Sequence, residues 1–239
     1  MSMGIAGLFM LAVSLVGPAP KGTPGTLQVK PGQTIVAIGD SITAAGGYLR
    51  MSEAFLAEHY PDRKIPEIIN AGINAQKAED LVLRFQQDVI DRRPAIVMIS
   101  IGINDVWHRL GAPHEEKILA AYRQNLKKMV DMAQKAGIKV ILLTPTVIEE
   151  DPKSEGNRRL SMYVEAQKQI AGEKKCQLLD LHQMFLDALE KKPADGGPTW
   201  LTVDGVHMRP LGDAIMAIGV LRGLGVRDAM LSALDPAEK

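Results

Sequence analysis

The 239-residue chain has one cysteine, Cys176, few aromatic residues and no net charge. A single cysteine excludes an internal disulfide framework and a zinc site built from several cysteines. Lys and Arg together number 28, as do Asp and Glu, so the chain lacks the basic excess typical of nucleic-acid-binding domains. The histidines lack zinc-ligand spacing and no acidic cluster suggests a calcium site. We therefore expect no nucleic-acid partner, no metal and no other cofactor.

No apolar run is long enough to span a bilayer stably. The longest, residues 4–17, is too short for a transmembrane helix, and a segment rich in Pro and Gly follows it. This order is typical of an export signal, so residues 1–25 are predicted to be a signal peptide with a flexible segment, and the protein to be periplasmic or secreted. Because no Lys or Arg precedes the run, an uncleaved extension on a cytoplasmic protein is the alternative.

Predicted strands and helices alternate from residue 34 onward. Uninterrupted apolar runs predict strands at 34–38, 67–70, 96–101, 139–143 and 177–180. Apolar residues at helical spacing predict helices near 48–59, 78–91, 115–136, 158–172, 183–191 and 211–224. The alternation predicts a parallel sheet with helices on both faces, because parallel strands need crossover connections. No internal repeat and no shift in composition marks a second domain, so residues 26–239 are predicted to form a single domain. Its fold class is α/β, a three-layer α/β/α sandwich around a parallel sheet of about five strands.

A serine follows the first predicted strand directly. Gly39 ends the apolar run, and Asp40 and Ser41 come next, at the sheet edge where open α/β folds hold ligands. Ser41 is therefore a candidate nucleophile if a base and an oxyanion site reach it. Serine is also a favoured helix N-cap, which is the alternative role for Ser41. Asp40 is predicted to anchor the turn through backbone hydrogen bonds.

Three further segments supply partners for this serine. Gly72 follows the second strand and Asn104 the third, so both are expected at the same sheet edge as Ser41. Asp204 precedes His207 by three residues. Its carboxylate could bond one ring nitrogen and leave the other to face a serine.

Among the other four histidines, His182 is the main competitor for the role of base. His182 follows the fifth predicted strand, and Asp180 lies two residues before it. Both side chains could therefore point to one face, although His182 is predicted to begin a helix. We favour His207 as the base.

The motifs are Gly39-Asp-Ser-Ile42, Gly72, Gly102-Ile-Asn-Asp105 and Asp204-Gly-Val-His207. In this order they resemble the four sequence blocks of the SGNH, or GDSL, hydrolase family, and the resemblance covers residues 34–224. It implies a flavodoxin-like SGNH hydrolase fold and a carboxylic ester hydrolase that forms an acyl-serine intermediate.

The resemblance also implies a role for each motif residue. Ser41 would be the nucleophile, His207 the base that accepts its proton, and Asp204 the residue that orients the histidine. The oxyanion hole would consist of the backbone N–H groups of Ser41 and Gly72 and the side-chain amide of Asn104. Independently of the resemblance, Tyr48, Trp107 and Trp200 fall in segments predicted to surround the site, and with His108 they form the possible substrate pocket. Ordinary packing is an equal alternative for the aromatic residues, and an exposed loop position is the alternative for His108.

The predicted substrate is a short-acyl, acetyl-type ester of a carbohydrate. Predicted export and the lack of an obvious apolar channel wall in the loops favour it over a lipid ester. Three alternatives stay open: a lysophospholipase or thioesterase acting on lipid-type esters, an acyltransferase using the same acyl-serine, and a non-catalytic carbohydrate-binding protein on the same fold.

Overall fold

A parallel sheet of five strands forms the centre of the computed structural model, which describes residues 4–16, 27–64, 68–227 and 231. The strands are β1 (Ile35–Gly39), β2 (Ile68–Gly72), β3 (Ile96–Ser100), β4 (Lys139–Leu143) and β5 (Gln177–Leu179). Their spatial order is β2-β1-β3-β4-β5, and every neighbouring pair is parallel. The chain reverses its direction of travel across the sheet at β1 and β3, where open α/β sheets bind ligands. The predicted sheet is confirmed.

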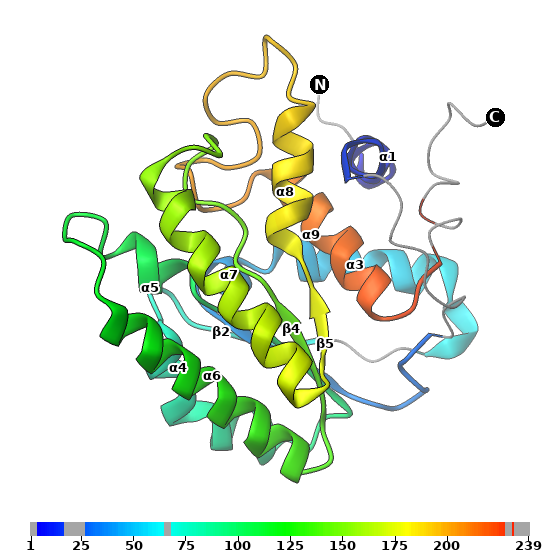
Figure 1. Ribbon diagram of the computed structural model, residues 1–239. Coiled ribbons are helices and arrows are strands. Elements are labelled where there is room, and N and C mark those ends of the chain that lie inside the picture. Colours follow the sequence, from blue (N-terminus) through cyan, green and yellow to red (C-terminus); the bar gives the residue numbers. More distant parts are fainter. Residues whose placement is uncertain (1–3, 17–26, 65–67, 228–230, 232–239) are drawn as a thin grey trace.

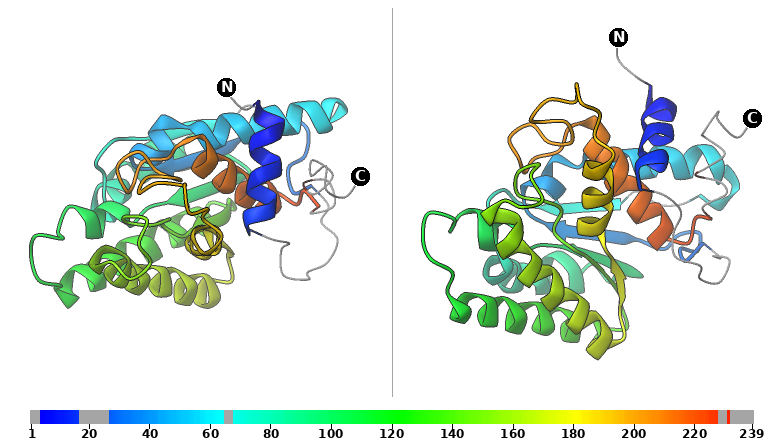
Figure 2. Two further views of the ribbon diagram at one scale, coloured as in Figure 1. Left: turned by 90° about the horizontal axis from the view of Figure 1, so that it is seen from above. Right: turned by 45° about the horizontal axis from the view of Figure 1, so that its top comes forward.

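Helices cover both faces of the sheet and make the predicted three layers (Figure 1; Figure 2). On one face α3 (Gly47–His59) packs against α9 (Pro210–Gly223). On the other face α4 (Ala78–Phe85), α6 (Glu116–Lys135) and α7 (Glu155–Lys174) lie side by side. The helix α8 (Leu181–Glu190) follows β5 and contacts α9. Both faces of β1 and β3 are buried as a result.

The apolar N-terminal run forms α1 (Ile5–Val16), which lies against α8 and α9. Phe9, Ala12 and Leu15 are buried there, and the Phe9 ring lies 5.5 Å from that of Phe55. The Lys191 ammonium donates hydrogen bonds to two carbonyl oxygens near the end of α1. The rest of the predicted signal segment, residues 1–3 and 17–25, lies outside the described residues. Within the described ranges, no helix has both the length and the apolar character needed to cross a membrane.

The structure adds two one-turn helices outside the predicted ones. They are α2 (Ser41–Ala45), directly after β1, and α5 (Ile103–Trp107), after β3. Five residues are too few to show a helical repeat, which is why the apolar pattern missed both. The short helices η1 (Pro61–Arg63) and η2 (Gln86–Ile90) complete the set, and η2 extends α4 as a π-helical turn. α7 begins three residues earlier than predicted because Ser154 caps it.

Two glycines let α2 lie directly on the strand ends. A Cβ added to Gly39 would lie 2.3 Å from Thr43 Oγ1 and 2.6 Å from the carbonyl oxygen of Ser100. A Cβ added to Gly72 would lie 2.1 Å from the backbone nitrogen of Ala44. No side chain fits in either place, so glycine at both positions sets how closely Ser41 approaches β2 and β3.

Replacing Gly39 with alanine is expected to lower the free energy of unfolding by about 1–3 kcal/mol, because α2 must shift to admit the methyl group. Gly172 provides the control, since it lies in α7 with nothing within 4 Å of an added Cβ. Gly172→Ala should raise stability by about 0.5–1 kcal/mol. Urea unfolding measures both, and a Gly39→Ala protein as stable as the wild type would show that α2 does not rest on this contact.

Candidate active site

The side chains of Ser41, His207 and Asp204 form an unbroken chain of hydrogen bonds. Ser41 Oγ lies 2.8 Å from His207 Nε2, although the two residues are 166 positions apart in the sequence. His207 Nδ1 lies 2.6 Å from Asp204 Oδ2. The structure therefore brings the hydroxyl of one segment together with the imidazole and carboxylate of another, distant in the sequence.

The turn between β1 and α2 positions Ser41. Asp40 is the N-cap of α2, and its Oδ1 accepts a 3.0 Å hydrogen bond from the Ile42 N–H. The predicted anchoring role of Asp40 is confirmed, and the alternative that Ser41 is the N-cap is wrong. As the first residue of α2, Ser41 has a backbone N–H that no intrahelical carbonyl reaches, because the first N–H groups of a helix precede their acceptors.

Tyr48 does not line a pocket, contrary to the prediction. Its side chain is fully buried, and its hydroxyl lies 3.1 Å from Thr43 Oγ1 in α2. The Tyr48 backbone N–H bonds to the Asp213 carboxylate at the start of α9. Tyr48 therefore supports the serine turn from inside the fold.

A tight turn, residues 202–208, carries Asp204 and His207. Asp204 Oδ1 accepts hydrogen bonds from the backbone N–H groups of Val206 at 3.0 Å and His207 at 2.8 Å. Burial works to raise the pKa of Asp204, but the bonds from His207 and Val206 outweigh it and hold that pKa below its usual value. The carboxylate is therefore ionised at neutral pH and aimed at the imidazole.

Glu150 supports this turn from the neighbouring loop, a role that the sequence did not indicate. Its carboxylate is 1% exposed and accepts hydrogen bonds from the backbone N–H groups of Trp200, Leu201 and Thr202, at 2.6–2.8 Å. The Lys192 ammonium lies 2.9 Å from the same carboxylate. Burial opposes ionisation, but these donors together hold the pKa of Glu150 below its usual value.

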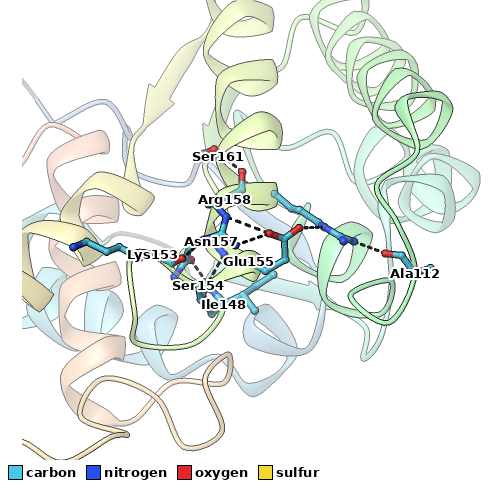
Figure 3. Close-up of polar contacts among 9 residues, drawn as sticks. Ala112, Ile148, Lys153, Ser154, Glu155, Asn157, Arg158 and Ser161 are labelled. Carbon is cyan, nitrogen blue, oxygen red and sulfur yellow. Dashed lines mark hydrogen bonds and ion pairs between the residues drawn. The ribbon is translucent and has the colours of Figure 1, made fainter.

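A second set of polar contacts fixes the loop that holds Glu150 (Figure 3). Ser154 Oγ accepts from the Asn157 N–H at 3.1 Å and donates to the Ile148 carbonyl at 3.1 Å. Asn157 Oδ1 in turn accepts from the Ile148 N–H at 2.9 Å. The next residue along, Glu149, donates its N–H to the Gly205 carbonyl at 2.8 Å. The start of α7 thus anchors the turn that carries the histidine.

The predicted oxyanion donors lie at the ends of β2 and β3. Asn104 is buried, and its Nδ2 donates one hydrogen bond to the Gln76 carbonyl at 3.0 Å. A primary amide has two N–H bonds, so a second donor remains on Asn104. The Gly72 N–H donates to Asn70 Oδ1 at 2.9 Å, and Asn70 Nδ2 donates to the Thr43 carbonyl at 2.7 Å. Without a bound substrate, the Gly72 N–H is therefore already hydrogen-bonded to the Asn70 side chain.

The other predicted pocket residues lie on two loops. The half-buried Trp107 ring meets the His207 ring edge-on, with centroids 5.7 Å apart. His108 is exposed, and its ring lies 5.5 Å from that of Trp107. Trp200 is half-buried on the loop held by Glu150. Trp107 is therefore the one of these three residues that has a ring contact with His207.

His182, the competing candidate for the base, is buried in the interior. It is buried in the first turn of α8, where its Nδ1 bonds to the Thr146 carbonyl and its N–H donates to Thr144 Oγ1 at 2.9 Å. Burial lowers the pKa of His182. His207, rather than His182, therefore faces the serine.

A hydroxyl, an imidazole and a carboxylate in series at the carboxyl edge of a parallel sheet are the arrangement found in enzymes of acyl transfer. Residues 37–215 match the GDSL-like Lipase/Acylhydrolase family. The chain belongs to this family and is a carboxylic ester hydrolase.

Known proteins resemble the chain over most of its length. An acetylxylan esterase of Geobacillus stearothermophilus is 31% identical over 217 residues, which cover 83% of this chain and 97% of that protein. The crystal structure of Axe2, an acetylxylan esterase from Geobacillus stearothermophilus, superposes with a TM-score of 0.74 at 30% identity over 83% of this chain and 96% of Axe2. An uncharacterized lipoprotein of Bacillus subtilis, YqeF, is 28% identical over 80% of this chain and 89% of its own.

Asp40 makes the stability of the protein depend on pH. Its side chain is 2% exposed, and burial raises its pKa to about 7. Between about pH 4, where an unfolded Asp titrates, and pH 7, the folded state keeps a proton that the unfolded state has lost. The contribution of Asp40 to the free energy of unfolding therefore falls as the pH rises through this interval.

Asp40→Asn keeps the oxygen that caps α2 and removes the titration. Urea unfolding at pH 5 and pH 8 should show the variant gaining about 2 kcal/mol relative to the wild type at the higher pH. A difference between the two proteins that is the same at both pH values would contradict a raised pKa at Asp40.

Proposed function

We propose that the protein hydrolyses short-chain acyl esters of carbohydrates through an acyl-serine intermediate. The observation that carries the proposal is the 2.8 Å contact between Ser41 Oγ and His207 Nε2, continued by the 2.6 Å contact between His207 and Asp204. A hydroxyl is a weak nucleophile until a base accepts its proton, and the imidazole lies where it would do so.

In the first half of the reaction, Ser41 Oγ attacks the carbonyl carbon of the ester while His207 Nε2 takes the hydroxyl proton. The resulting imidazolium is stabilised by the Asp204 carboxylate on its other nitrogen. The tetrahedral intermediate then breaks its bond to the alcohol oxygen, which receives the proton from His207. In the second half, water attacks the acyl-serine, again giving its proton to His207, and the carboxylic acid leaves as Ser41 is reprotonated.

The negative oxygen of each intermediate requires preorganised donors. The backbone N–H of Ser41 and the second N–H of the Asn104 amide are available for it. The Gly72 N–H joins them when Asn70 Oδ1 gives it up to the oxyanion, a charged and stronger acceptor. Each such donor contributes a factor of about 10²–10³ to turnover in enzymes of this type.

The carbohydrate acetyl ester is favoured by the relatives and by the site. The Geobacillus relative is named an acetylxylan esterase, as is Axe2, and the catalytic variants of Axe2 replace a serine, an aspartate and a histidine. The last two are spaced in that protein as Asp204 and His207 are here. Beside the imidazole, the half-buried Trp107 offers an aromatic surface of the kind that packs on sugar rings.

Export stays a prediction. The apolar segment that suggests it is folded as α1 against α8 and α9, and the relative YqeF is described as a lipoprotein. N-terminal sequencing of the protein from the producing cell tests it: a first residue near position 26 supports export with cleavage, and a first residue at or before Ile5 contradicts cleavage.

Ser41→Ala is expected to abolish hydrolysis of p-nitrophenyl acetate and covalent labelling by a fluorophosphonate, because both need the hydroxyl. Ser161→Ala is the matched control, since Ser161 is an exposed serine on α7. It should keep full activity and labelling. A folded wild type that resists the reagent would favour the non-catalytic carbohydrate-binding alternative.

The acyl preference separates carbohydrate acetyl esters from lipid-type esters. The ratio kcat/KM should be highest for p-nitrophenyl acetate and should fall about tenfold or more by octanoate, since the proposed substrate carries an acetyl group. Release of acetate from acetylated xylooligosaccharides, measured in parallel, tests the alcohol half. A preference for octanoate would support the lysophospholipase or thioesterase alternative instead.

A further inference from the structure

Arg84 on α4 lies outside the predicted site, yet its guanidinium reaches the ends of both β1 and β2. Its side chain is 13% exposed. Nη2 donates to the Gly39 carbonyl at 3.1 Å, and Nη1 donates to the Ala71 carbonyl at 2.9 Å. Nε donates to Gln76 Oε1 at 2.6 Å, and Nη1 also pairs with Asp88 Oδ2 at 2.6 Å. Four acceptors from separate segments thus surround one planar cation.

Two of these acceptors belong to the backbone that carries oxyanion donors. The Ala71 carbonyl and the Gly72 N–H are the two ends of one peptide group, so the bond from Arg84 fixes the plane in which that N–H points. The Gly39 carbonyl lies at the end of β1, one residue before Asp40 and two before Ser41.

The third acceptor leads to the amide of Asn104. Gln76 binds Arg84 through its side-chain oxygen and Asn104 Nδ2 through its main-chain oxygen, at 2.6 Å and 3.0 Å. The orientation of the Asn104 amide, and with it the direction of its second N–H, therefore depends on a residue that Arg84 holds. One side chain is connected in this way to all three proposed donors.

The chemistry of the guanidinium suits this task. Its donors are fixed in a plane, so it orders several acceptors at once, whereas an ammonium is a single point of charge. A cation bonded to a carbonyl oxygen also draws electron density from the peptide group and strengthens the N–H at its other end. Asp88 balances the charge at the solvent side, with 19% of its side chain exposed.

We propose that Arg84 is a positioning residue for the oxyanion hole, acting through the Ala71–Gly72 peptide and through Gln76. The proposal rests on the proposed serine-esterase function. Since an oxyanion forms only during the reaction, the loss of Arg84 should lower kcat and leave KM nearly unchanged.

The test compares Arg84→Lys with Asp88→Asn in the full chain, using p-nitrophenyl acetate. Arg84→Lys keeps the charge but not the fork, so kcat should fall about 10- to 100-fold at an unchanged KM. Asp88→Asn removes only the ion-pair arm of Arg84, so it should lower the melting temperature and keep kcat within about twofold. Equal falls in kcat for the two variants would overturn the proposal.

A boronic acid gives a readout that a loss of stability does not move. Phenylboronic acid forms a tetrahedral adduct with an active serine and mimics the oxyanion intermediate, so its inhibition constant should rise in Arg84→Lys in step with the fall in kcat. An unchanged inhibition constant would contradict the proposal. A wild type with no esterase activity would instead defeat the proposed function itself.

Gln76→Met supplies a second variant in case Arg84→Lys does not fold. It breaks the link between Arg84 and the Asn104 support while leaving the main-chain carbonyl of residue 76 in place. The expected result is a smaller fall in kcat, about fivefold or more, again with KM unchanged. Wild-type kcat in a folded Gln76→Met protein would overturn the proposed route through Gln76.

Discussion

The hydrogen bond between Ser41 and His207 joins two segments that are 166 residues apart in the chain. A separation of 2.8 Å leaves little tolerance, because a displacement of about 1 Å would break the contact and cost roughly a hundredfold in rate. Neither residue lies within a long element that would place it alone. The rest of the structure is arranged so that the start of α2 and the 202–208 turn meet at one point.

The two sides of this contact are held by different means. On the serine side, Gly39 and Gly72 admit the backbone of α2 onto the strand ends, and Asp40 caps the helix. On the histidine side, the buried Glu150 carboxylate accepts hydrogen bonds from backbone N–H groups at the start of the turn. The Glu149 N–H donates to the Gly205 carbonyl within the turn. Close packing therefore positions Ser41, whereas hydrogen bonds to a buried carboxylate position His207.

The sheet could be predicted because apolar runs determine its strands, and the candidate site residues could be predicted because they stand in four motifs that resemble a known family. Apolar runs predict the strands to within two residues of their observed ends. The three-residue spacing of Asp204 and His207 allows the Asp204 carboxylate to reach the His207 ring. The residues that support the site could not be predicted. Glu150 and Arg84 contact backbone groups of segments that are distant in the sequence, and such contacts leave no periodic pattern. The prediction that Tyr48 lines a pocket is wrong because a sequence pattern indicates the segment of a residue but not whether its side chain is buried.

Acid quenching of the enzyme during turnover of p-nitrophenyl acetate, followed by mass mapping of its peptides, tests the central claim most directly. If the hydroxyl of Ser41 attacks the ester, the peptide that contains Ser41 carries one acetyl group, and the modification disappears when the substrate is exhausted. Turnover with no acetyl group on that peptide, or with a transient acetyl group on another residue, would contradict the account.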